Sequence, residues 1–254
     1  MLIDTHSHIY STDFTQDRDE VIQRAYSNDV RKIILPNIDS STVKNLLDMV
    51  DTYPHICIPL MGLHPTSVNN DYKEELQLVE YWLKKRKFYG IGEIGIDLFW
   101  ETAFLEEQTK AFRFQLELAR QYMLPVVIHV RDSFDEVYKV LTEPNDKKLT
   151  GVFHSFTGTF DQAQLIIALG FKIGVGGIVT FKKSGMDQII SKIDPSNLIL
   201  ETDSPYLTPV PFRGKRNESS YLVYIAQKIA ELHQMTVGDI AKITTENARK
   251  LFGI

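Results

Sequence analysis

The feature of this sequence that most constrains its fold is a regular alternation of short apolar runs with longer amphipathic stretches. The apolar runs are continuous, rich in β-branched residues and mostly bounded by Gly, Pro or Asp, which is typical of buried parallel strands. The alternation predicts an α/β protein built of strand–helix units. The predicted strands are Leu2–Ile3, Lys32–Leu35, Ile56–Met61, Phe88–Ile94, Val126–Val130, Gly151–Phe153, Phe171–Val175 and Leu198–Leu200.

Helical stretches follow these strands, the clearest being residues 103–122. The others fall near 17–28, 40–52, 72–86, 133–143, 159–169, 184–193 and 219–233, and a final helix near 236–251 begins after Thr236, a predicted N-cap. Eight such units in 254 residues predict a TIM (β/α)8 barrel with an extra C-terminal helix, forming one domain over residues 1–254. A doubly wound open sheet is the alternative. The barrel is favoured because polar residues end six different strands, and only a closed ring lets them converge.

Composition excludes several classes of protein. Hydrophobic residues are 43% and charged residues 24% of the chain, as in ordinary globular proteins. The net charge of −5 argues against a protein that coats nucleic acid or anionic membranes. Cys57 is the single cysteine, so an intramolecular disulfide framework is excluded. Neither a signal peptide nor an apolar run of membrane-spanning length is evident, and we expect a cytoplasmic protein without a membrane partner.

Five of the seven histidines fall at the ends of predicted strands: His6, His8, His64, His129 and His154. His6 and His8 form a His-x-His pair after the first strand, and side chains two residues apart in a strand share a face. Both imidazoles can therefore reach one metal ion, although such a pair alone is also compatible with a structural role. His129 and His154 end adjacent strands of the predicted barrel, so their side chains can meet as metal ligands.

Two acidic residues join these histidines. Glu93 stands among apolar residues of a buried strand, where a carboxylate is rare without a partner. It forms either a core ion pair or a bridge between two cations. Asp203 follows the eighth strand, which a closed barrel places beside the first, so we expect it next to His6 and His8. A role for Asp203 as the N-cap of the following turn is the alternative.

Other residues are candidates for substrate contacts. His64 follows the third strand, and we interpret it as a substrate or phosphate contact. Arg131 can clamp an oxyanion or form a surface ion pair. Arg213 and Lys215 lie in the one concentrated basic stretch, Phe212-Arg213-Gly214-Lys215-Arg216, after the eighth strand. That loop is either a phosphate contact above the barrel or a solvated loop.

The ordered set of motifs resembles the TatD family of metal-dependent hydrolases, which belong to the amidohydrolase-type barrels. The resemblance runs nearly end to end. It rests on Asp4-Thr5-His6-Ser7-His8, Gly62-Leu63-His64-Pro65, Gly92-Glu93-Ile94-Gly95-Ile96-Asp97, Ile128-His129 with Arg131-Asp132, His154-Ser155-Phe156-Thr157-Gly158, Glu201-Thr202-Asp203-Ser204-Pro205-Tyr206-Leu207, Arg213-Gly214-Lys215-Arg216-Asn217-Glu218 and Thr244-Thr245-Glu246-Asn247. One departure is Ser219, which stands where the family usually has proline.

The resemblance implies a TIM barrel with two divalent metal ions and a deoxyribonuclease activity of the 3′→5′ exonuclease type. By the matching motifs, His6, His8 and Asp203 hold one ion, His129 and His154 hold the other, and Glu93 bridges them. Mixed imidazole and carboxylate ligands suit Zn, Mn, Fe or Ni, while Mg stays open. Two such ions clamp an in-line displacement at phosphorus, and Asp203 is the candidate general base.

Competing functions stay open at this point. The same residues suit hydrolysis of a carboxylic ester or amide, including aminoacyl-tRNA deacylation, because the fold and ligands do not decide the substrate. A metal-stabilised scaffold without activity is the third hypothesis, although structural metal sites are usually closed. The acidic net charge favours an enzyme that acts on single-stranded DNA ends over one that grips long duplex. The chain can be a monomer.

Overall fold

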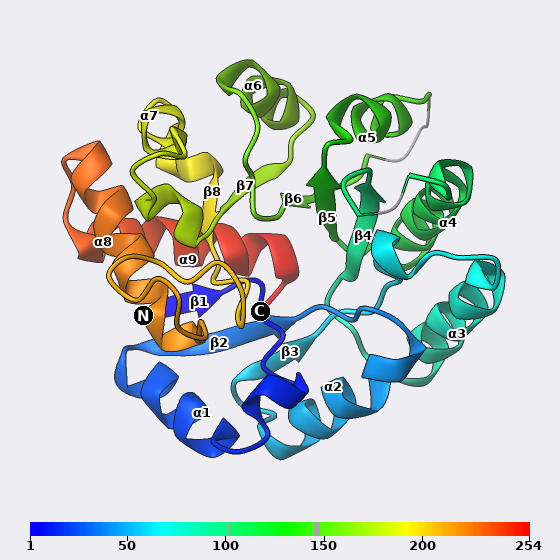
Figure 1. Ribbon diagram of the computed structural model, residues 1–254, viewed down its shortest axis with the longest axis horizontal. Helices are drawn as coiled ribbons and strands as arrows, with labels where there is room; N and C mark the ends of the chain where they lie inside the picture. The colour runs from blue at the N-terminus through cyan, green and yellow to red at the C-terminus, as the bar shows by residue number, and fades with distance from the viewer. Residues whose placement is uncertain (101, 145–147) are drawn as a thin grey trace.

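A computed structural model describes residues 1–100, 102–144 and 148–254. In these ranges, parallel strands alternate with helices, and α1 to α8 lie around the outside of the strands (Figure 1). The chain therefore has the α/β fold with parallel strands that the alternation predicts. The strands are β1 (Leu2–Asp4), β2 (Val30–Leu35), β3 (Cys57–Pro59), β4 (Ile91–Asp97), β5 (Val126–Arg131), β6 (Gly151–Phe153), β7 (Lys172–Val175) and β8 (Leu198–Leu200).

The α-helices lie close to the predicted amphipathic stretches. They are α1 (Arg18–Ser27), α2 (Ser40–Thr52), α3 (Tyr72–Lys85), α4 (Leu105–Tyr122), α5 (Phe134–Leu141), α6 (Phe160–Ala168), α7 (Met186–Ile190), α8 (Leu222–His233) and α9 (Val237–Phe252). Thr236 caps α9, because its side chain accepts a hydrogen bond from the backbone N–H of Asp239. No helix in the described ranges is long and apolar enough to cross a membrane.

The strands form two sheets, ordered β1-β2-β3 and β4-β5-β6-β7-β8. Backbone hydrogen bonds connect both pairs of sheet edges. The N–H of Thr5, just after β1, donates to the carbonyl of Leu200 in β8 over 3.0 Å. On the other side, the N–H of Gly92 in β4 donates to the carbonyl of Met61, just after β3, over 3.0 Å. This arrangement, which is consistent with a TIM barrel, brings the carboxyl ends of all these strands to one side.

The core has two parts. A large apolar cluster lies between the strands and the outer helices. A smaller cluster lies on the inner side of the two sheets and draws its residues from several strands and from α9: Ile3, Ile34, Ile58, Leu60, Val127, Val152, Ile199, Ala248 and Phe252. Helix α9 packs at the amino ends of β1 and β8, where Thr245 donates to the carbonyl of Met1 and Asn247 to that of Leu198. The inner cluster is thus closed from that end.

Most elements differ from their predicted bounds by one to three residues at an end, and the differences are largest in β4 and α7. Strand β4 begins and ends about three residues later than predicted, because its pairing with β5 extends to Asp97 opposite Arg131. Helix α7 is shorter than the predicted 184–193, since it begins only after Gly185, whose φ of 71° is left-handed.

Candidate metal centre

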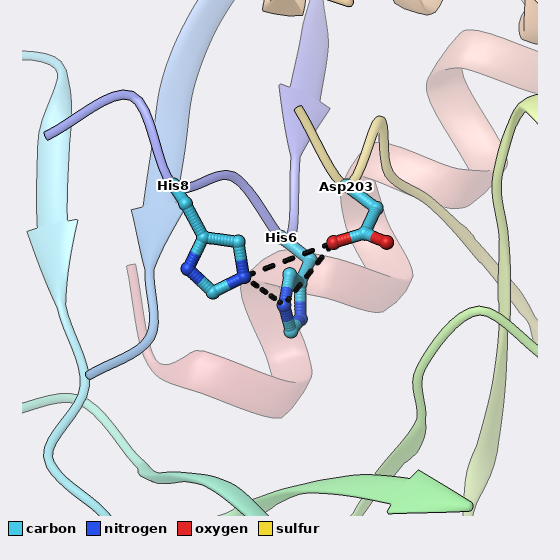
Figure 2. A group of neighbouring side chains, drawn as sticks. All are labelled: His6, His8 and Asp203. Carbon is cyan, nitrogen blue, oxygen red and sulfur yellow. Dashed lines mark hydrogen bonds and ion pairs between the residues drawn. The ribbon is translucent and has the colours of Figure 1, made fainter. Parts of the chain in front are cut away.

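His6, His8 and Asp203 form one group of side chains at the carboxyl ends of β1 and β8. The two histidines lie two residues apart and their side chains converge, with their Nε2 atoms 3.2 Å from each other. Asp203 Oδ1 lies 3.8 Å from Nε2 of His6 and 3.7 Å from Nε2 of His8. Figure 2 shows both rings turned toward the Asp203 carboxylate. The backbone bond from Asp203 N to the carbonyl of His6 holds the two chain segments side by side, as expected.

Glu93 stands at the centre of the site and is 2% exposed. Its Oε2 atom lies 3.0 Å from Nε2 of His6 and 3.7 Å from Nε2 of His8. Its Oε1 atom lies 2.9 Å from Nδ1 of His129 and 2.9 Å from Nε2 of His154. The two carboxylate oxygens therefore face two different sets of imidazoles. This is the arrangement that a bridging carboxylate requires.

The structure also places His64 inside this cluster. Its Nε2 atom is 3.3 Å from Oε1 of Glu93, and its ring meets that of His129 edge to face at 4.6 Å. On the other side of the ring, Nδ1 accepts a hydrogen bond from the backbone N–H of Thr66. A substrate contact was expected for His64, and this position also suits a metal ligand. His64, Glu93 and His129 together can hold an ion.

Buried partners orient several of the imidazoles. His8 Nδ1 lies 2.9 Å from the hydroxyl of Tyr10, and His129 Nε2 lies 2.8 Å from Oδ2 of Asp97. His154 Nδ1 faces Oε1 of Glu201 at 3.4 Å. Such outer partners fix which ring nitrogen is free for a metal and hold the ring in place.

Burial and mutual contact set the charges of the cluster. Burial, assisted by His154, lowers the pKa of His6 to about 4. Burial also opposes ionisation of Glu93, but the surrounding histidines outweigh it and hold the pKa of Glu93 well below its usual value. Burial raises the pKa of Asp203 to about 7. At neutral pH Glu93 is ionised and His6 is neutral, which are the forms that bind metal ions.

The donor set fits divalent metal ions. Bonds of about 2.0–2.2 Å to a tetrahedral ion place neighbouring ligand atoms about 3.3–3.6 Å apart, and the distances above bracket that range. The groups His6–His8–Asp203 and His6–Glu93–His154 each bring their ligand atoms within 4.8 Å of one another. His6 Nδ1 is buried without a hydrogen-bond partner among the described residues. Imidazoles facing one another at hydrogen-bond distance are best satisfied by a cation between them.

Arg131, Arg213 and Lys215 do not join the cluster. The Arg131 guanidinium lies 3.8 Å from the ring centre of Phe99. Arg213 lies over the ring of Phe181 at 3.7 Å. Lys215 lines a cavity of about 560 Å³, together with Arg24 and Arg216 among other residues. Their roles as substrate contacts stay predictions.

Two residues of the site escaped the sequence reasoning. Tyr10, whose hydroxyl oxygen lies beside His8 Nδ1, is 2% exposed and donates its hydroxyl proton to the carbonyl of Pro36 over 2.5 Å. Asp97, the partner of His129, was noted only as the end of a motif. The available signal was its place at the end of a fully buried strand, where an ionisable group needs a partner.

The comparisons with known proteins cover the whole chain. A family model described as TatD related DNase matches residues 3–253. An uncharacterized metal-dependent hydrolase of Bacillus subtilis, YabD, is 38% identical over 255 residues, which is 100% of each chain. Another from Escherichia coli, YjjV, is 32% identical over 255 residues, 99% of this chain and 98% of its own.

A solved structure agrees with these sequence matches. The crystal structure of YjjV, described as a TatD homolog from Escherichia coli, superposes with a TM-score of 0.93 and covers 100% of this chain and 98% of its own. A β-aspartyl dipeptidase from Fervidobacterium islandicum has a TM-score of 0.68 at 15% identity, and this likeness concerns the fold alone. The chain therefore belongs to the family of TatD-related DNases and is a metal-dependent hydrolase.

Proposed function

We propose that this protein is a deoxyribonuclease that removes nucleotides from the 3′ end of single-stranded DNA. The observation that carries the proposal is the position of Glu93, whose two oxygens face two separate sets of imidazoles. Two-ion centres of this kind are suited to in-line displacement at phosphorus. The name of the matching family supports the same substrate class.

In this proposal Glu93 would be a ligand of both metal ions. His6, His8 and Asp203 would hold the first ion and His129 and His154 the second, while His64 lies beside His129. When bound, the ions supply an activated water and neutralise charge on the phosphoryl oxygens. Mixed imidazole and carboxylate ligands suit Mn, Zn, Fe or Ni, and also Mg where substrate phosphates complete its shell.

The chain's own residues position the substrate and move the proton. Asp203, which lies at the edge of the cluster and is 14% exposed, accepts the proton of the attacking water as general base. His64 and Arg131 contact the oxygens of the phosphate that is cleaved. Arg213 and Lys215, on the loop after β8, contact phosphates farther from the cleaved bond. The bond between phosphorus and the 3′ oxygen of the preceding nucleotide breaks, and that sugar oxygen leaves and takes up a proton from solvent.

The proposal requires that strand ends from all parts of the chain meet at one point. We therefore infer that the two sheets act as one closed barrel, in a single domain over residues 1–254 with α9 as an added helix. The hydrogen bonds between Thr5 and Leu200 and between Gly92 and Met61 support this closure.

The test uses a single-stranded DNA oligonucleotide labelled at its 5′ end and protein stripped of metal, to which Mg, Mn or Zn is added back. We expect a ladder that shortens from the 3′ end only when metal is present. Asp203→Asn is the matched control, since it keeps the shape of the side chain and removes both the proposed base and a charged metal ligand. Absence of cleavage with every metal, despite metal bound at the cluster by elemental analysis, would refute the nuclease proposal.

A second candidate is hydrolysis of an aminoacyl ester or a small amide. A cavity of about 400 Å³ opens beside His154, and its lining includes the carboxylates of Asp132, Asp135 and Glu136. Carboxylates repel phosphates and favour a substrate with a free ammonium group. The same metal-loaded protein should then release amino acids from aminoacyl-tRNA while leaving the DNA oligonucleotide intact.

A further inference from the structure

Two aromatic side chains are exposed immediately after β4, beside the candidate metal centre. Phe99 is 52% exposed and Trp100 is 68% exposed. Their rings meet edge to face with centres 4.9 Å apart. The Arg131 guanidinium lies 3.8 Å from the centre of the Phe99 ring and 5.2 Å from that of Trp100. These three residues, which we call the Phe99–Trp100–Arg131 platform, present flat apolar surface and a positive charge to solvent.

The platform is tied to the candidate metal centre through one carboxylate. Asp97 Oδ1 accepts hydrogen bonds from the backbone N–H groups of Phe99, over 3.0 Å, and of Trp100, over 2.8 Å. The other oxygen, Oδ2, lies 2.8 Å from Nε2 of His129. Asp97 is itself fully buried. The orientation of His129 and the position of the two aromatic residues are therefore set by the same group.

Arg131 has unused capacity for binding. Among the residues that the structure describes, its guanidinium makes no hydrogen bond or ion pair, so its contacts there are with the two rings. It lies at the carboxyl end of β5, two residues after His129. A guanidinium in this position can contact a phosphate while it stacks on the ring below it. Charge and flat surface are thus combined at the edge of the site.

We propose that the Phe99–Trp100–Arg131 platform stacks a base of single-stranded DNA and so holds the strand end over the metal centre. Exposed aromatic rings beside a cationic group are the usual means of binding single strands without sequence preference, because every base has a stacking face. The inference rests on the proposed nuclease function and names how its substrate is gripped. It also explains how an acidic protein holds DNA without a broad basic surface.

The test measures binding, so that it does not depend on cleavage. The chain has two tryptophans, and the Trp82→Phe background leaves Trp100 as the only tryptophan reporter. With Mn²⁺ present, the protein is titrated with a DNA trinucleotide whose linkages are phosphorothioate, and with the same chain carrying abasic sugars at its two 3′ positions. We expect the first to quench Trp100 fluorescence and to bind roughly tenfold more tightly than the second.

A variant and a matched control separate stacking from general effects. The double variant Phe99→Leu/Trp100→Leu keeps apolar bulk but removes the rings, and we expect it to bind both probes alike when measured by competition with a labelled oligonucleotide. Tyr26→Leu is the control. Tyr26 is 60% exposed and carries the Arg31 guanidinium 4.0 Å above its ring, but Arg31 lies near the amino end of β2, at the opposite end of the strands. This variant should keep the preference for bases.

The outcomes distinguish this inference from the function on which it rests. Cleavage of DNA together with equal binding of the two probes would overturn the platform alone. A preference for the base-containing probe without any cleavage would support stacking and refute the nuclease. Failure to bind either probe and to cleave would overturn both.

Discussion

The two ends of the strands differ sharply although they belong to the same strands and the same faces. On the α9 side, Val127, Val152 and Ile199 belong to the inner apolar cluster. Each of these residues is followed two positions later by a polar residue of the site: His129, His154 and Glu201 respectively. Side chains two residues apart point to the same face and lie about 6.6 Å apart along a strand. One step along these strands therefore separates a layer that stabilises the fold from a layer proposed to carry the chemistry.

The polar end also carries backbone strain. Asp132, Ser155 and Asp203, all just after strands, have positive φ values of 53°, 46° and 56°. Such conformations cost about 1–3 kcal/mol each. Near them, His6 Nδ1 and Glu201 Oε2 are buried without hydrogen-bond partners among the described residues. The apolar layer and α9 offset these costs, so substitutions at the two ends should have opposite consequences for activity and stability.

The largest effect is expected at the polar end. Asp203→Asn removes the proposed general base and should lower kcat by about 10²–10⁴-fold. The free energy of unfolding in the absence of metal should not fall, because a buried carboxylate with a raised pKa is replaced by a neutral amide. The measurements are steady-state cleavage and urea unfolding. Asp29→Asn, at an exposed acid far from the metal centre, is the control. A similar loss of kcat in this variant would show that the effect is not specific to Asp203.

The converse change at the apolar end is Phe252→Ala. Phe252 is 4% exposed and packs in the inner cluster from α9. Its truncation leaves a cavity and should lower the free energy of unfolding by about 3 kcal/mol. The kcat of the folded protein should stay unchanged. If Phe252→Ala keeps the wild-type free energy of unfolding but has a lower kcat, the apolar and polar layers do not act separately, and the contrast between them is wrong.

Removal of metal tests whether the polar end depends on its ligand. A ligand that binds only the folded chain stabilises it by about 2.7 kcal/mol when present at a hundred times its Kd. Chelation should therefore lower the melting temperature of the wild type and of Phe252→Ala alike, and leave His6→Ala little changed. If chelation lowers the melting temperature of His6→Ala as much as that of the wild type, the stabilising ion binds elsewhere. Loss of stability without any activity to lose would instead favour the metal-stabilised scaffold.

The smallest effect is expected for Asp97→Asn. This change weakens the support of His129, and such outer partners typically contribute 10- to 100-fold in metal affinity or activity. Metal affinity is measured by competition with a chelating dye, and kcat is measured at limiting and at saturating metal. A kcat that is low at limiting metal and returns to the wild-type value at saturating metal would assign Asp97 to positioning His129. An unchanged metal affinity would contradict that role.

Much of the architecture was predictable from the sequence, but not every boundary. Strands β6 and β8 have the predicted bounds, Gly151–Phe153 and Leu198–Leu200. The bounds of β4 differ from the prediction, because the apolar run does not specify how far the strand pairs with β5. The position of Arg213 and Lys215 relative to the cluster also could not be predicted. Loop direction there follows from long-range bonds, such as those from Asn217 to the carbonyls of Thr202 and Tyr206.

The sequence by itself determined which polar residues lie in or just after the strands and what ligand chemistry they offer, since strand periodicity and residue type are local properties. Only the tertiary structure decided which of them meet. Glu93 touches imidazoles from distant parts of the chain, His64 joins the cluster, and Asp97 serves both His129 and the turn bearing Phe99. These contacts depend on how the strands are arranged and how far each one extends, and no local pattern encodes those distances.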